Sequence, residues 1–109
     1  MIRHVVLFSA KRPEDVDTIV DTLSGYADIP AVETLSVRRN LRLDASSGEI
    51  DLMLEATFAT LDDLDAYKRH PIYQRGTATV RPLRELRFVV DTELDAAGSA
   101  TATREAIDA

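Results

Sequence analysis

The sequence predicts an α+β domain with the element order βαββαβ, in which the four strands form one antiparallel sheet. Four segments are rich in β-branched and apolar residues or alternate apolar with polar residues, as strands do, and two regions between them have helical spacing. A length of 109 residues, with 45% hydrophobic and 29% charged residues, suits a single globular domain. We therefore expect one core and one sheet.

The first half of the chain predicts a strand, a helix and a second strand. Residues 2–8 are apolar on both faces, which is typical of a strand covered on both sides. Pro13 suits the first turn of a helix. Gly25 and Pro30 end that helix. Its apolar stripe has helical spacing: Val16, Ile19, Val20 and Leu23. Residues 32–43 then alternate in polarity, which predicts a strand.

A second strand of the same hairpin follows the turn-rich residues 44–48. Residues 50–58 place Ile50, Leu52, Leu54, Ala56 and Phe58 on one face. Because short alternating segments joined by a turn pair with each other, we expect a hairpin here.

The last third of the chain predicts an interrupted helix and a closing strand. Thr60 suits the N-cap of a helix with Leu61, Leu64 and Tyr67 on one side. His70-Pro71 interrupts it, because the residue before proline is steered away from helical geometry. Residues 72–80 resume as a helical turn or two, loosened by Gly76, and residues 83–91 form the last strand.

The order βαββαβ is the ferredoxin-like plan, whose two helices cover only one face of the sheet. The strands here carry apolar residues on both faces, so the second face also needs a cover. In a short chain, we expect that cover to be a second copy of the same chain. An isologous contact would then close the two sheets into a dimeric α/β barrel.

Composition narrows the partners and the location. The net charge of −6 opposes nonspecific binding to nucleic acid or to anionic membranes. No apolar run reaches the roughly 20 residues of a membrane span. The chain contains no cysteine, which fits a cytoplasmic protein without disulfides. We expect residues 1–92 to form the domain and residues 93–109 to be an acidic, mobile tail.

Several short motifs follow one another in a recognisable order. Residues 2–8 form an opening strand that contains a histidine, and residues 55–58 lead into a helix that ends in Tyr67-x-x-His70-Pro71. Residues 87–91 form a closing strand that ends in an acid. Together these motifs resemble the stress-responsive α/β-barrel (Dabb) family over about residues 1–92. The resemblance implies a dimeric α+β barrel.

One branch of that family is a plant polyketide cyclase that forms olivetolic acid without a cofactor, using a tyrosine and a histidine as its acid/base pair. The resemblance places its tyrosine at Tyr67 and its first-strand pocket histidine at His4. Its catalytic histidine falls on Tyr73 and its third-strand pocket histidine on Leu52, which are departures. Its tryptophan before the last strand falls on Arg84.

Three residues are candidates for acid/base chemistry, and each has a structural alternative. His4 would be a polar group inside the barrel, or a buried histidine bonded within the protein. His70 would line the barrel mouth, or would bond to backbone groups at the helix break. Tyr67 would donate to a ligand, or would pack in the core with its hydroxyl at the rim. Five further residues are candidates for contact with a ligand: Phe8, Tyr26, Leu52, Leu54 and Tyr73.

No metal or cofactor is expected, because the two histidines are far apart in sequence and no phosphate-binding glycine loop is present. Two hypotheses remain, and the sequence leaves open whether the protein is an enzyme. The first is a homodimer that binds a small apolar or aromatic molecule in the barrel, with cofactor-free chemistry of the cyclase kind. It predicts a cavity of several hundred Å³. The second is a noncatalytic structural dimer whose barrel is filled by side chains.

Overall fold

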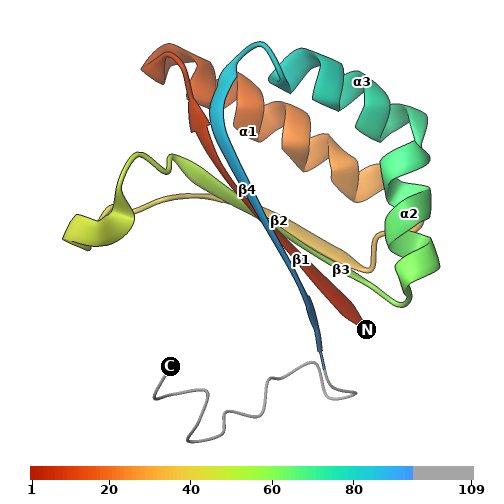
Figure 1. The fold of residues 1–109 in the computed structure, drawn as a ribbon. Coiled ribbons are helices and arrows are strands. Elements are labelled where there is room, and N and C mark those ends of the chain that lie inside the picture. The colour runs from red at the N-terminus through yellow and green to blue at the C-terminus, as the bar shows by residue number, and fades with distance from the viewer. Residues whose placement is uncertain (95–109) are drawn as a thin grey trace, which may run out of the picture.

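The computed structural model describes residues 1–94, which form one antiparallel four-stranded sheet with its helices on one face (Figure 1). The order of the strands in the sheet is β2-β3-β1-β4. The elements are β1 (Ile2–Ala10), α1 (Val16–Ser24), β2 (Thr34–Arg39), β3 (Leu52–Phe58), α2 (Leu61–Arg69), α3 (Pro71–Val80) and β4 (Arg84–Glu93). This arrangement confirms the predicted ferredoxin-like α+β fold. The predicted tail, residues 93–109, lies outside the described residues from position 95 onward.

The central strand, β1, fixes which side chains meet across the sheet. It pairs with β3 and with β4, and His4 lies opposite Ala56 on one side and Asp91 on the other. Residues paired in this way point to the same face of an antiparallel sheet. His4, Val6 and Phe8 therefore face the helices together with their partners.

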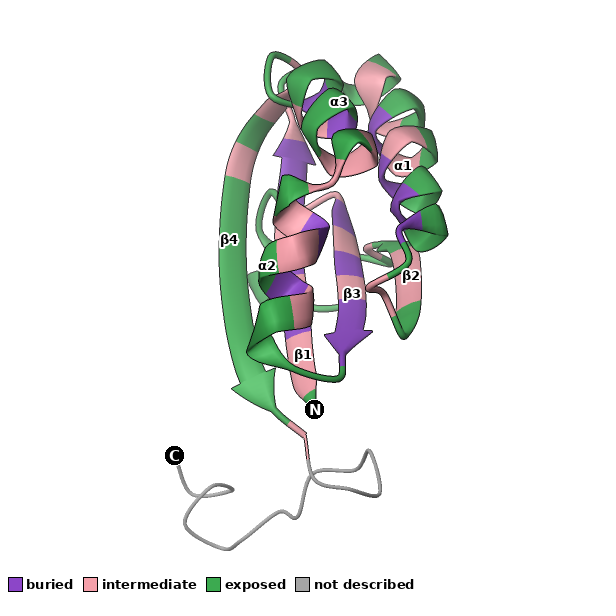
Figure 2. Cartoon of the chain, turned by 90° about the vertical axis from the view of Figure 1, so that its right-hand side faces the viewer, coloured by how far each residue is buried: buried purple, intermediate pink, exposed green. Residues whose placement is uncertain are grey.

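The core lies between this face of the sheet and the helices, as the buried surfaces of β1 and β3 show in Figure 2. Ile19 and Leu23 supply the buried side of α1, which follows from the apolar stripe of that helix. β3 is the most buried strand, with Leu52, Leu54 and Ala56 at most 1% exposed. In contrast, most of β4 is exposed at the sheet edge (Figure 2).

The predicted helix break is confirmed. The Thr60 side chain accepts a hydrogen bond from the backbone N–H of Asp63 (3.1 Å) at the start of α2. α2 ends at Arg69, and α3 begins at Pro71 with His70 as its N-cap. The two helices therefore meet at an angle and both lie over the sheet (Figure 1).

Gly76 does not loosen α3, contrary to the expectation, because the helix runs unbroken from Pro71 to Val80. A Cβ atom at position 76 would lie 2.6 Å from the Tyr26 hydroxyl oxygen and closer still to its ring. The glycine therefore allows α3 to pack directly against Tyr26.

The hairpin strands are shorter than predicted. β2 ends at Arg39, because the side-chain amide of Asn40 donates to the Ile50 carbonyl (2.8 Å) and Arg42 pairs with Asp51. These side-chain contacts replace the strand ladder between the two strands. Leu41 is 78% exposed and contributes nothing to the core of this chain.

The face of the sheet opposite the helices, here called the open face, is not covered by residues 1–94. Phe88 and Val90 of β4 point to it, and they are 54% and 55% exposed. Leu7 and Val5 pair with them and are half-buried. Among the described residues, no helix is long and apolar enough to cross a bilayer.

Candidate functional site

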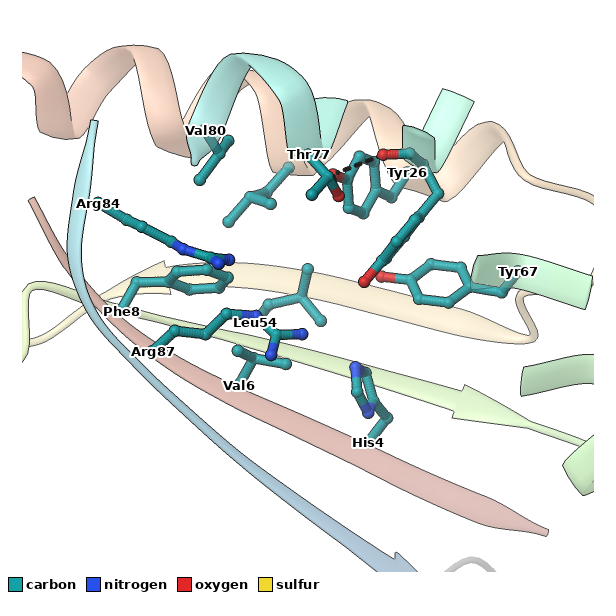
Figure 3. Close-up of a pocket in the computed structure, with 12 residues that line it drawn as sticks. His4, Val6, Phe8, Tyr26, Leu54, Tyr67, Thr77, Val80, Arg84 and Arg87 are labelled. Atoms are coloured by element: carbon teal, nitrogen blue, oxygen red, sulfur yellow. Dashed lines mark hydrogen bonds between the residues drawn. The ribbon is translucent and has the colours of Figure 1, made fainter. Parts of the chain in front are cut away.

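A pocket lies between the sheet and the helices of a single chain, and we call it the helix-side pocket (Figure 3). Its lining residues are His4, Val6, Phe8, Leu23, Tyr26, Leu54, Tyr67, Tyr73, Thr77, Val80, Arg84 and Arg87. Its free space is about 310 Å³ when the open mouth is included, but the centre of a water molecule can occupy only about 20 Å³ of it. The side chains therefore nearly fill it, leaving room for about one water molecule.

Most of the predicted site residues meet in this pocket. His4 and Tyr67 line it with four of the five expected ligand contacts: Phe8, Tyr26, Leu54 and Tyr73. Leu52 is fully buried in the core and lies outside the lining. Of the two positions that the sequence left open for His4, the one inside a barrel between two copies does not hold, because this face of β1 is covered by the chain's own helices.

His4 pairs with an acid from the neighbouring strand. Its Nδ1 lies 2.6 Å from Oδ1 of Asp91, and the His4 side chain is 1% exposed. An ionised carboxylate only accepts hydrogen bonds, so Nδ1 carries the proton and donates a hydrogen bond to Asp91. In a neutral imidazole, the lone pair then lies on Nε2, and no described residue hydrogen-bonds to that atom.

Burial sets the protonation states of two polar groups that line the pocket, His4 from β1 and Tyr67 from α2. Burial lowers the pKa of His4 below its ordinary value, and the contact with Asp91 opposes that effect only in part. His4 is therefore neutral at neutral pH. Burial also raises the pKa of Tyr67 well above its usual range, so its hydroxyl keeps its proton. The floor thus holds one base and one proton donor.

An aromatic cluster holds Tyr67 in place. The ring centroid of Tyr67 lies 4.9 Å from that of Phe58, 5.0 Å from that of Tyr73 and 6.0 Å from that of His4. The Tyr26 hydroxyl is used structurally, because it lies 3.2 Å from Oγ1 of Thr77 and donates to the Tyr73 carbonyl (3.3 Å). By contrast, the described residues offer the Tyr67 hydroxyl no hydrogen-bond partner. Among the described residues, the hydroxyls of Tyr67 and Tyr73 are thus both without a hydrogen-bond partner, whereas that of Tyr26 is engaged.

His70 lies outside the helix-side pocket. Its Nδ1 accepts a hydrogen bond from the backbone N–H of Ile72 (3.1 Å), which caps the first turn of α3. Of the two roles that the sequence left open, the geometry therefore favours the structural one. We do not include His70 among the residues proposed to contact a ligand.

Sequence reasoning missed two features of the pocket. The pairing of Asp91 with His4 depends on the register of β4, which sequence spacing does not show. Arg84 and Arg87 were not expected in the pocket at all. Alternation along β4 could have indicated that Arg87, Val89 and Asp91 share one face. Within residues 1–94, no three His, Cys, Asp or Glu side chains gather as a metal site requires.

Comparison with known proteins places this geometry in context. The model of one protein family, the stress-responsive A/B barrel domain (Dabb), matches residues 2–94. No curated protein matches the sequence significantly.

Several solved structures share the fold. One is a dimeric ferredoxin-like protein of unknown function from Thermobifida fusca, which is 29% identical with a TM-score of 0.75 over 85% of this chain and 90% of that one. A Dabb family protein with a ferredoxin-like fold from Mesorhizobium loti is 23% identical, with a TM-score of 0.68 over 84% and 94%. An antibiotic biosynthesis monooxygenase is 11% identical, with a TM-score of 0.67 over 87% and 99%. The last two show likeness of fold alone.

Proposed function

Since this chain belongs to the stress-responsive A/B barrel domain (Dabb) family, we propose that it is a homodimer that binds a small, largely apolar molecule in the helix-side pocket. The walls of that pocket are apolar and aromatic, including Val6, Phe8 and Leu54. Only a few polar groups converge on it. This combination is typical of small-molecule sites.

The observation that carries the proposal is the pairing of His4 with Asp91 at the floor of the pocket. A neutral histidine oriented by a carboxylate is a general base, and its free Nε2 is the atom that would accept a proton. Asp91 would stabilise the imidazolium formed by that transfer. This arrangement supports cofactor-free acid/base chemistry, of the kind that the resemblance to a polyketide cyclase implies.

Tyr67 would stabilise the negative charge that the same proton transfer creates on the ligand. When a base removes a proton from a carbon beside a carbonyl group, negative charge develops on the carbonyl oxygen. A buried phenol that keeps its proton can donate a hydrogen bond to that oxygen. The proton held by His4 then returns to the product, so the enzyme ends the cycle in its starting state.

The open face supports the proposed homodimer. Phe88 and Val90 are exposed apolar residues on this face, and half-buried Met53 lies beside them across β1. Monomeric soluble proteins rarely leave such a surface uncovered. The Thermobifida fusca protein is described as dimeric, and two copies of one sheet face can pair by two-fold symmetry.

A noncatalytic dimer remains a second candidate, and a specific observation favours it. The centre of a water molecule can occupy only about 20 Å³ of the pocket, so the side chains largely fill it in this conformation. If the protein is a noncatalytic dimer, His4 and Asp91 would be a structural pair. The two candidates differ in whether a ligand can enter.

Native mass spectrometry of freshly purified protein tests the proposal, because it reports stoichiometry and retained ligand together. We expect a dimer that carries a small organic mass. Thr77→Leu should remove that mass by filling the pocket, whereas Thr79→Leu, an exposed position on the same helix, should leave it in place. A dimer that carries no organic mass would favour the noncatalytic candidate, and a monomer would overturn the proposed assembly.

A further inference from the structure

Two arginine side chains reach into one end of the helix-side pocket. Arg84 and Arg87 leave β4 and extend into the pocket, with Arg84 passing beside Phe8 (Figure 3). Within residues 1–94, neither has a carboxylate within ion-pair distance, although four other arginines form ion pairs with carboxylates. These two cations are therefore placed at a pocket without a compensating anion from the described chain.

Arg84 lies close to two other cations at this end of the pocket. Burial lowers the pKa of Arg84 below its ordinary value, and the nearby charges of Arg87 and Arg81 lower it further. The chain as a whole carries a net charge of −6, so this positive cluster contrasts with the rest of the protein. A guanidinium group matches the two oxygens of a carboxylate with two parallel hydrogen bonds.

The register of the sheet gives the distance between this cluster and the base. Arg87 lies opposite Phe8, and Asp91 lies opposite His4, so the two ends of the pocket are four residues apart along β1. At about 3.3 Å per residue, that separation is about 13 Å. Val6 and Leu54 line the stretch between them and offer no polar group to a ligand.

From this arrangement we infer that the ligand is an elongated carboxylate. Its acid group pairs with Arg84 and Arg87, its apolar body lies along Val6 and Leu54, and its far end reaches His4 and Tyr67. The inference rests on the proposed function, because it names the ligand class of the same pocket. The two long side chains would have to turn outward to admit such a ligand, because the pocket as it stands has room for about one water molecule.

Binding of octanoate and of octan-1-ol, measured by NMR titration of the dimeric full-length protein, tests this inference. The two probes have similar length and apolar bodies, and only octanoate is charged. We expect octanoate to bind at least ten-fold more tightly than octan-1-ol. The signals of His4 should shift with both probes, because both chains lie along the pocket.

Matched variants assign the charge effect to the two arginines. Arg84→Gln combined with Arg87→Gln should weaken octanoate binding at least ten-fold and leave octan-1-ol binding unchanged. Arg75→Gln is the control, because Arg75 is exposed, lies outside the pocket lining and does not affect the pKa of Arg84. Circular dichroism checks that the variants fold, which we expect because neither pocket arginine forms an ion pair with the described residues.

The outcomes separate this inference from the proposed function. Equal binding of the two probes, or full octanoate affinity in the double variant, would overturn the carboxylate assignment and leave the apolar pocket standing. Absence of binding by both probes would overturn the proposed pocket, and the carboxylate assignment with it.

Discussion

At the scale of single residues, His4 is buried but forms a hydrogen bond with only one of its two ring nitrogens. His4 is 1% exposed and has one protein partner, Asp91, although imidazole has two nitrogens that can form hydrogen bonds. Nε2 of His4 is not among the fully buried, unpartnered polar atoms of residues 1–94, so it keeps some exposure at the pocket. Its presence at the floor of a pocket is consistent with a partner supplied by a ligand.

The lowered pKa of His4 predicts how stability depends on pH. Unfolded His4 takes up a proton as the pH falls below about 6.5, whereas the folded protein resists protonation until a lower pH. The contribution of neutral, buried His4 to the free energy of unfolding should therefore be complete only well above pH 6.5. It should decrease by up to about 1.4 kcal/mol per pH unit as the pH falls toward the lowered pKa.

Urea denaturation between pH 7.5 and pH 5.5, at fixed protein concentration, measures this dependence. His4→Gln removes the titrating group, so its free energy of unfolding should change less with pH than that of the wild type. If the two proteins lost stability in parallel over this range, His4 would not be the group responsible.

At the scale of elements, the break between α2 and α3 positions the aromatic wall. Tyr67 lies near the end of α2, and Tyr73 lies in the first turn of α3, with ring centroids 5.0 Å apart. His70 and Pro71 separate the two helices, because the histidine caps α3 and the proline suits its first turn. A continuous helix would place these two tyrosines differently.

The capping role of His70 predicts a loss of stability without a loss of binding. His70→Ala removes the acceptor for the backbone N–H of Ile72 and should lower the free energy of unfolding by about 1 kcal/mol. His70→Asn should recover most of that loss, because asparagine is a good N-cap. Octanoate affinity should stay the same in both variants. Weaker binding at unchanged stability would return His70 to the list of ligand contacts.

At the scale of the whole molecule, the two faces of the sheet differ in what covers them. The helix-covered face holds the core and the pocket, and the open face carries exposed Phe88 and Val90. Leu41 and Leu43, in the connection after β2, are 78% and 87% exposed and border a groove that Leu7 and Met53 also line. The apolar surface thus extends beyond the sheet, as expected if a second copy covers both parts.

A charge on the open face should therefore separate the copies. Val90→Lys places a cation in an apolar contact and, by symmetry, repeats it in the partner, so we expect the dimer dissociation constant to rise at least ten-fold. Leu61→Lys is the matched control, because Leu61 is an exposed apolar residue (64%) on α2. Analytical ultracentrifugation distinguishes the outcomes, and equal dissociation of the two variants would place the interface elsewhere.

The sequence by itself determined the order of the elements, the residues that share one face of β3, and the helix break at His70-Pro71. These features are local, since alternation, helical spacing and proline geometry act over a few residues. The sequence also placed His4 and Tyr67 together, although that step depended on the family resemblance.

Only the tertiary structure decided which groups meet across the sheet. The pairing of His4 with Asp91 and the position of Arg87 beside Phe8 follow from the register of β1 and β4, which lie some eighty residues apart in the chain. The position of His4 under the chain's own helices rather than between two copies is also a packing result. Such contacts depend on how distant segments fit together, and a local pattern of polarity carries no information about that fit.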